Sequence, residues 1–129
     1  HLGQHDISAL EERNIIGNEK IIGISTHSII QARQAQKDGA DYIAIGPIYP
    51  TSTKDYEPSV GIEIIQKISE AVVNIPIIAI GAITLENLDE VLKAGASRIA
   101  VCSAIIDSKD IYSSTRQFKE KLDEAQVHG

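Results

Sequence analysis

The sequence is poor in sulfur and in aromatic side chains. It contains no methionine or tryptophan, one phenylalanine and one cysteine, Cys102. A single cysteine excludes an internal disulfide and is typical of a reducing compartment, so we expect a cytoplasmic protein. No apolar run approaches the roughly 18 residues that a membrane-spanning helix needs. The first residues do not have the pattern of a signal peptide, and we expect no membrane partner.

Basic residues are outnumbered by acidic ones, and the formal net charge is -6. Proteins that bind nucleic acids need a basic face for the phosphate backbone, so we expect no nucleic-acid partner. A small phosphorylated molecule remains a candidate ligand. A few backbone N–H groups and one lysine can hold it against an acidic background.

Four short apolar runs are the strongest structural signal. They are rich in β-branched residues, are bounded by turn residues, and cover residues 21–25, 42–46, 75–81 and 99–103. Polar and apolar residues do not alternate within them, which is typical of strands covered on both faces. The length suits one domain, so residues 1–129 are predicted to form a single unit around these strands.

Segments with helical spacing lie between the runs. Ser8 and Glu11 make a capping box, which predicts a helix over residues 9–16. Ser28 and Thr84 are suited to cap two later helices. Apolar stripes are formed by Ile62, Ile65, Ile68 and Val72, by Leu85, Leu88, Val91 and Leu92, and, in the last helix, by Ile111, Phe118 and Leu122. These stripes predict helices that each pack one face on the strands.

A glycine turn precedes two of the strands. Gly39 and Gly95 stand where a helix would end in the left-handed conformation that glycine adopts at little cost. The repeated order of strand, loop, helix and glycine turn predicts a parallel α/β protein. Two architectures fit it equally. One is a small doubly wound sheet of the flavodoxin type, and the other is half of a (β/α)₈ barrel, since a full barrel needs about 250 residues.

The carboxyl ends of the strands are where parallel α/β proteins bind their ligands. All four ends carry glycine, serine or threonine, in residues 25–27, 46–54, 81–84 and 102–104. The second of these loops is the most informative, because prolines stiffen it and Thr51, Ser52 and Thr53 are followed directly by Lys54. Rigid donors beside a mobile cation predict a phosphate or pyrophosphate clamp.

The last two strand ends are similar to the phosphate site that many barrels build there. Gly81 and the backbone near Cys102 and Ser103 are expected to donate N–H groups to a phosphate. The side chain of Cys102 is interpreted as a small buried residue rather than a nucleophile, because no basic residue stands near it.

Two further residues have both a structural and a chemical interpretation. Asp6 is either an N-cap of the first helix or a Mg²⁺ ligand, since magnesium takes one or two carboxylates together with phosphate oxygens. His27 is either structural or a base or donor at the edge of the ligand. The four histidines show no metal-ligand spacing, and no Gly-x-Gly-x-x-Gly or Walker sequence is present.

Four motifs together resemble the thiamine-phosphate synthase family. They are residues 1–6 (HLGQHD), 23–27 (GISTH), 46–54 (GPIYPTSTK) and 79–84 (AIGAIT), in that family's order and at its spacing over essentially the whole chain. The resemblance implies a (β/α)₈ barrel, of which this chain is the second half, about strands 5–8 with their helices. It also implies that the first half is absent, in agreement with a chain that begins at His1 and has no methionine.

The resemblance implies a reaction and a role for several residues. Enzymes of the family join hydroxymethylpyrimidine diphosphate to thiazole phosphate, giving thiamine phosphate and pyrophosphate with Mg²⁺. Asp6 would then be a Mg²⁺ ligand. Ser25 and Lys54 would be the catalytic residues that contact the pyrimidine diphosphate, with Lys54 stabilising the departing pyrophosphate. The thiazole phosphate would be bound by Thr51, Ser52, Thr53 and the backbone around Ala82, Cys102 and Ser103.

The chain departs from the family pattern in two places. Ala82 stands where the family has a second glycine, which implies strain if this residue needs a positive φ, and His5 replaces a common acidic residue. Without the first half, we expect the chain alone to lack meaningful synthase activity and to pair with itself or with the missing part through its open sheet edges. The alternatives are a thiazole tautomerase with His27 as proton shuttle, and a non-catalytic half-barrel module that binds phosphorylated ligands.

Overall fold

The computed structural model describes residues 1–52 and 58–128. Within them, four parallel strands form one sheet in the order β1-β2-β3-β4. Their bounds are β1 Gly23–Thr26, β2 Tyr42–Ile45, β3 Ile77–Ile80 and β4 Ile99–Ala100. Leu2 adds a single parallel bridge to Ile24 beyond β1. The predicted strands and their parallel arrangement are confirmed, although each strand is shorter than its apolar run.

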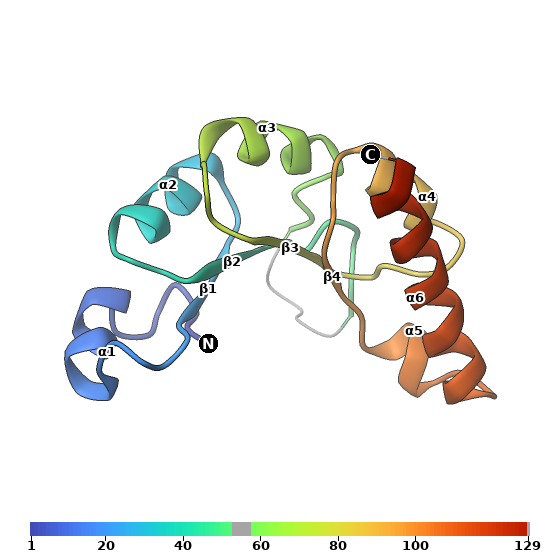
Figure 1. Cartoon of the computed structure of the whole chain (residues 1–129), viewed down its shortest axis with the longest axis horizontal. Coiled ribbons are helices and arrows are strands. Elements are labelled where there is room, and N and C mark those ends of the chain that lie inside the picture. Colours follow the sequence, from blue (N-terminus) through green and yellow to red (C-terminus); the bar gives the residue numbers. More distant parts are fainter. Residues whose placement is uncertain (53–57, 129) are drawn as a thin grey trace.

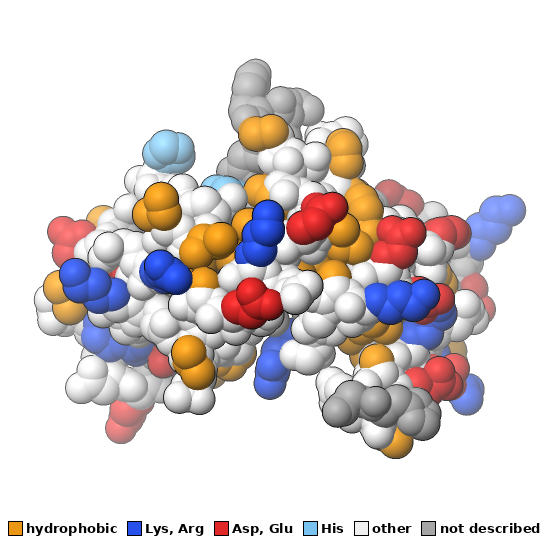
Figure 2. All heavy atoms as spheres, turned by 90° about the horizontal axis from the view of Figure 1, so that it is seen from above, with side chains coloured by type: hydrophobic (Ala, Val, Ile, Leu, Met, Phe, Trp, Pro, Cys, Tyr) orange, Lys and Arg blue, Asp and Glu red, His pale blue; other side chains and the backbone are white. Residues whose placement is uncertain are grey.

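The helices follow one another around the outside of the curved sheet, and its inner side carries no helix of the described residues (Figure 1). Their bounds are α1 Ala9–Ile16, α2 Ile29–Lys37, α3 Glu63–Ala71, α4 Leu88–Lys93, α5 Ser103–Ile106 and α6 Ile111–His128. Seen from above in Figure 2, the outer face shows acidic and basic side chains interspersed rather than gathered by sign.

The sequential strand order decides between the two predicted architectures. A doubly wound sheet reverses its strand order at a switch point and carries helices on both faces. Here each strand pairs with the next one in the chain, and the helices lie on one side of the sheet (Figure 1). This singly wound arrangement is that of a barrel wall. The flavodoxin-type alternative is therefore wrong.

The hydrophobic core lies between the outer face of the sheet and the helices. Ile43 and Ile45 of β2 and Ile65 and Ile68 of α3 are fully buried there. On the inner face, by contrast, Ile80 of β3 is 42% exposed. The sequence predicts strands that are covered on both faces. In the described residues the outer face is covered by helices, whereas the inner face is only partly covered.

The helix starts follow the sequence with one exception. Ser8 and Glu11 form the expected capping box, and the Ser28 hydroxyl accepts a hydrogen bond from the Gln31 N–H. Thr84, however, closes a turn ahead of α4, whose N-cap is Asn87. In the last helix Phe118 is buried as expected, but Ile111, the first residue of α6, is 55% exposed.

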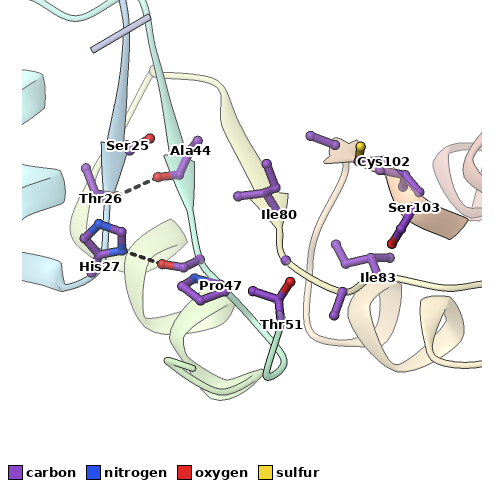
Figure 3. A pocket seen from close by; sticks show the side chains of 15 residues that line it. Ser25, Thr26, His27, Ala44, Pro47, Thr51, Ile80, Ile83, Cys102 and Ser103 are labelled. Atoms are coloured by element: carbon purple, nitrogen blue, oxygen red, sulfur yellow. Dashed lines mark hydrogen bonds between the residues drawn. The ribbon is translucent and has the colours of Figure 1, made fainter. Parts of the chain in front are cut away.

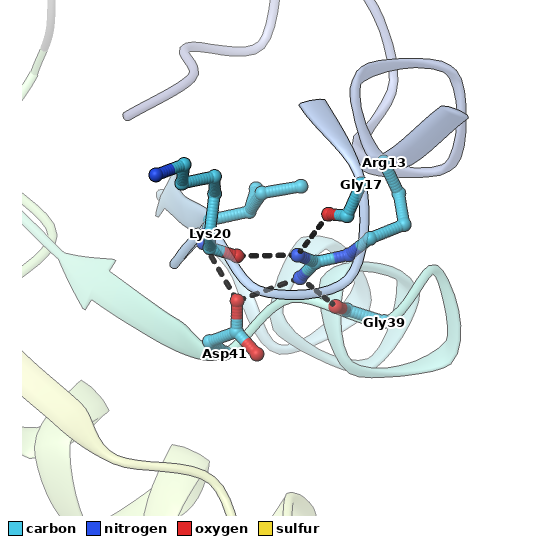
Figure 4. Close-up of polar contacts among 6 residues, drawn as sticks. Arg13, Gly17, Lys20, Gly39 and Asp41 are labelled. Carbon is cyan, nitrogen blue, oxygen red and sulfur yellow. Dashed lines mark hydrogen bonds and ion pairs between the residues drawn. The ribbon is translucent and has the colours of Figure 1, made fainter. Parts of the chain in front are cut away.

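Arg13 of α1 ties together the segments that enter β1 and β2 (Figure 4). Its guanidinium donates to the carbonyl groups of Gly17 and Lys20 and, at 2.6 Å, to the Asp41 carboxylate. Asp41 also accepts from the Ile22 N–H at 2.6 Å. The Ile22 amide and the Arg13 guanidinium hold the pKa of Asp41 below its usual value. The cluster lies at the amino ends of the strands, where barrels place stabilising rather than catalytic residues.

No helix among residues 1–52 and 58–128 combines the length and the apolar character needed to cross a membrane.

Candidate functional site

A pocket of about 210 Å³ lies at the carboxyl ends of the strands. Its floor is apolar, with Ala44 and Ile80 from the inner face of the sheet, and its rim carries hydroxyl groups. Figure 3 shows Ser25, Thr26 and His27 on one side and Cys102 and Ser103 on the other, with Thr51 between them. A mainly apolar pocket with a few convergent polar groups is typical of small-molecule sites.

The structure brings most of the predicted site residues together. Those that line the pocket are Ser25, Thr51, Ala82, Cys102 and Ser103. Ser52 is exposed and does not line it. Thr53 and Lys54 lie outside the described residues. Asp6 is exposed and lies apart from the lining.

Two glycines allow the loops after β2 and β3 to touch. A Cβ at Gly46 would lie 2.2 Å from the carbonyl oxygen of Ile80. A Cβ at Gly81, whose φ is +111°, would lie 2.5 Å from the Cα of Pro47. Both clashes are with backbone or proline-ring atoms that have little freedom to move. These glycines are therefore required for the contact of the two loops that form the middle of the pocket.

Ala82 adopts a positive φ of +50°, which is uncommon for a residue with a side chain. The strain expected from its replacement of a glycine is thus present. Asn87 stabilises this conformation: its Nδ2 donates to the Ala82 carbonyl at 3.0 Å, and its Oδ1 accepts from the Thr84 N–H at 2.8 Å. Asn87 was not predicted as a site residue. An asparagine three residues after a threonine was the available signal, since such side chains commonly bond to nearby backbone.

Replacing Ala82 by glycine should stabilise the chain by about 0.5–1 kcal/mol. The left-handed conformation destabilises alanine in the folded chain by about 1–2 kcal/mol, and glycine removes this strain. Glycine also gives the unfolded chain more conformational freedom, which offsets about 0.5–1 kcal/mol of the gain. Urea unfolding followed by circular dichroism measures the difference. Ala94→Gly is the matched control, because Ala94 has a φ of -72° and should lose about 0.5–1 kcal/mol instead. A loss of stability in both variants would contradict the strain at Ala82.

His27 holds the two neighbouring strand ends together. Its Nδ1 is 2.5 Å from the carbonyl oxygen of Gly46, and its backbone N–H donates to the Oε1 of Gln31 at 2.7 Å. The first contact crosses from the end of β1 to the loop after β2 (Figure 3). The structural interpretation of His27 therefore has a direct basis in its contacts.

Tyr49 fixes the outer part of the same loop to α4. Its hydroxyl donates to the Oε2 of Glu90 at 3.3 Å. Burial of the phenol, together with the negative charge of Glu90, raises the pKa of Tyr49. This contact could not be predicted from local sequence patterns, because the two residues are 41 positions apart.

Cys102 corrects the sequence analysis, because it is exposed and not buried. β4 ends at Ala100, and Cys102 lies directly before α5 on the side of the pocket. No described element covers that side of the sheet, so its thiol is open to the ligand space.

Asp6 is not the N-cap of α1, which is Ser8. Its Oδ2 accepts from the Gly3 N–H at 2.6 Å, and its own N–H donates to the Gly3 carbonyl at 3.3 Å. The turn closed in this way holds an exposed carboxylate. No group of three or more metal-ligating side chains exists among the described residues. A single carboxylate nevertheless fits Mg²⁺, which completes its shell with phosphate oxygens and water.

Together, fold and site define a parallel α/β protein of the barrel type with a small-molecule pocket at the carboxyl ends of its strands. A profile of the thiamine monophosphate synthase family (TMP-TENI) matches residues 1–105. The chain belongs to this family, as its motifs predicted.

Relatives and solved structures agree with this assignment. The chain is 45% identical over 125 residues to a thiamine-phosphate synthase of Halalkalibacterium halodurans, covering 96% of this chain and 59% of the relative. It is 48% identical over 123 residues to one of Methanospirillum hungatei, covering 95% and 59%. A thiamine phosphate pyrophosphorylase from Pyrococcus furiosus superposes with a TM-score of 0.86 at 37% identity, over 96% of this chain and 58% of that one. The chain thus spans less than two thirds of the length of these relatives.

Proposed function

We propose that this chain belongs to an enzyme that joins hydroxymethylpyrimidine diphosphate to thiazole phosphate, giving thiamine phosphate and pyrophosphate. The observation that carries the proposal is the convergence of Ser25, Thr51, Ala82 and Ser103 on one pocket at the carboxyl ends of the strands. The family motifs predict that these residues bind the two phosphorylated substrates. The relatives that bear the name of this activity match nearly the whole chain.

The reaction needs charge stabilisation and placement more than a protein nucleophile. The bond between the exocyclic carbon and the diphosphate oxygen breaks, and its electron pair leaves with pyrophosphate. The lone pair of the thiazole nitrogen forms the new carbon–nitrogen bond. We assign Lys54 to the charge that builds on the departing pyrophosphate, and Ser25 to the pyrimidine diphosphate. Holding both substrates in line removes much of the entropic barrier.

The loop after β3 is the proposed phosphate site for the thiazole. Gly81 and Ala82 both have positive φ and turn the chain at the end of β3. Backbone N–H groups in turns form concavities that bind anions. Asn87 stabilises the shape of this turn through its hydrogen bonds to the Ala82 carbonyl and the Thr84 N–H. Cys102 and Ser103 line the same pocket from the end of β4, and Thr51 lines it from the loop after β2, with Ser52 and Thr53 next along the chain. Bound Mg²⁺, held in part by Asp6, would supply further neutralisation of the diphosphate.

We propose further that the chain is the second half of a (β/α)₈ barrel, about strands 5–8 with their helices. Three observations support this proposal. Ile80 is partly exposed on the inner face, the strand order is sequential, and the chain covers only 59% of the length of the Halalkalibacterium halodurans relative. The proposed occupant of the open side is the βα segment that the relatives carry in addition. Without it, the chain should pair with itself. A monodisperse monomer in light scattering would contradict this.

The cytoplasm is the proposed compartment.

Mixing the chain with the N-terminal part of the Halalkalibacterium halodurans relative tests the proposed function. Neither part alone should release pyrophosphate from the two substrates with Mg²⁺, whereas the mixture should, and thiamine phosphate should form in equal amount. The chain fused to the same N-terminal part is a second arrangement in case the parts do not associate. Turnover by the chain alone would contradict the division of the site. If the fusion folds and contains the whole active site but releases no pyrophosphate, the result would favour a thiazole tautomerase or a non-catalytic module that binds phosphorylated ligands.

A further inference from the structure

We propose that His1 and Tyr42 are positioning residues that make the Ser25 hydroxyl a hydrogen-bond donor toward the ligand. The inference rests on the proposed function only for the identity of that ligand. Ser25 lines the pocket from β1, and nothing in the motifs assigns a role to either partner.

The three side chains form a continuous hydrogen-bonded series. The Nε2 of His1 is 2.8 Å from the Oγ of Ser25, and the Nδ1 of His1 is 2.8 Å from the hydroxyl of Tyr42. The imidazole thus spans two side chains from adjacent strands. Its ring centroid lies 5.6 Å from that of Tyr42, at a tilt of 33°.

The backbone holds this series in place. The Leu2 N–H donates to the Gly23 carbonyl and the Ser25 N–H donates to the Leu2 carbonyl, each at 2.8 Å. The Nε2 of Gln4 donates to the Ser25 carbonyl at 2.7 Å. Ser25 is therefore fixed at its N–H, its carbonyl and its hydroxyl, all by the first four residues of the chain.

Gly23 makes room for the phenol. A Cβ at this position would lie 1.9 Å from the Cζ of Tyr42. Gly23 and Tyr42 are directly paired across β1 and β2, so the ring of Tyr42 lies over Gly23 and its hydroxyl reaches His1. Any larger residue at position 23 would displace the ring and break the series.

The direction of the hydrogen bonds follows from the chemistry of the groups. A neutral imidazole has one donor and one acceptor nitrogen, and the bond made by one nitrogen fixes the tautomer. A phenol is a better donor than acceptor, so Tyr42 donates to the Nδ1 of His1. The Nε2 then carries the proton and donates to the Oγ of Ser25. The hydroxyl hydrogen of Ser25 is left to point into the pocket, toward an acceptor on the diphosphate or the pyrimidine ring.

Nitrogen-15 NMR of the four histidines tests the tautomer in the chain itself, with His1→Gln to assign the signal. We expect His1 to be protonated at Nε2, and Tyr42→Phe to shift it toward protonation at Nδ1. Tyr112→Phe is the matched control, because Tyr112 is an exposed residue of α6. A His1 protonated at Nδ1 in the unaltered chain would overturn the proposal.

A double-mutant cycle with hydroxymethylpyrimidine diphosphate, measured in the chain fused to the N-terminal part of the Halalkalibacterium halodurans relative, separates positioning from simple structural support. Tyr42→Phe and Ser25→Ala should each weaken binding by about tenfold, as loss of one hydrogen bond predicts. The double variant should lose no more than Ser25→Ala alone. Additive losses would overturn the proposal. The two proposals can also be told apart. If the diphosphate does not bind but His1 is protonated at Nε2, the proposed function is wrong and the positioning of Ser25 is still supported.

Discussion

Replacing Gly81 by alanine should destabilise the chain by about 3 kcal/mol or more, as is typical of a substitution that forces backbone to move. The added Cβ would lie 2.5 Å from the Cα of Pro47 and 2.8 Å from the backbone nitrogen of Ile48. Neither atom belongs to a flexible side chain. The φ of +111° adds conformational strain of about 1–2 kcal/mol. Urea unfolding monitored by circular dichroism measures the change.

Gly95→Ala is the matched control for this experiment. Gly95 has a φ of +100°, close to that of Gly81, but no atom lies within 4 Å of its missing Cβ. Its substitution should therefore cost only the strain, about 1–2 kcal/mol. The difference between the two variants isolates the contact between the loops after β2 and β3. Equal losses would mean that the two loops do not touch as described, and the geometry of the pocket would be wrong.

Replacing Arg13 by alanine should cost about 2–3 kcal/mol, because the guanidinium makes charged hydrogen bonds to several carbonyl groups and one carboxylate. Its side chain is only 18% exposed, so water does not replace these partners fully. Arg116→Ala is the control: Arg116 pairs with Glu120 at 2.7 Å on the surface of α6, with 66% of its side chain exposed. Such exposed pairs contribute little to stability, so Arg116→Ala should destabilise the chain far less than Arg13→Ala. Thermal and urea unfolding of both variants compare the two.

The Arg13 cluster also predicts a pH dependence. The pKa of Asp41 is lowered in the folded chain, first by the Ile22 N–H and then by Arg13. A carboxyl group with a lowered pKa contributes stability above its unfolded value, about 3.9, and loses it as the pH falls through the folded pKa. The stability gap between the unaltered chain and Arg13→Ala should therefore narrow below about pH 4. A gap that stays constant down to pH 2 would show that Asp41 does not contribute.

The features that could be predicted from the sequence are those set by neighbouring residues. The apolar runs located the strands, Ser8 and Glu11 located the start of α1, and Gly39 has the expected positive φ. The choice between barrel and doubly wound sheet could not be made from periodicity, because both contain the same repeating unit and differ only in how the units are placed.

The parts of the site that could not be predicted depend on contacts between distant residues. His1 meets Ser25 across 24 positions and Tyr42 across 41, and no local pattern encodes either contact. The exposure of Cys102 and Ile111 was missed for a related reason, because burial depends on which elements cover a position. The motifs of the family nevertheless predicted that Ser25, Thr51, Ala82 and Ser103 belong to one site, and all four line the pocket.

If the pocket at the carboxyl ends of the strands binds the thiazole phosphate, an NMR titration of the chain with this compound will show it. We expect saturable shifts of the backbone amides of residues 81–84 and 102–104, with little change around Arg13 and Asp41 at the opposite end of the sheet. A folded chain whose amides do not respond, or respond chiefly at that opposite end, would contradict it.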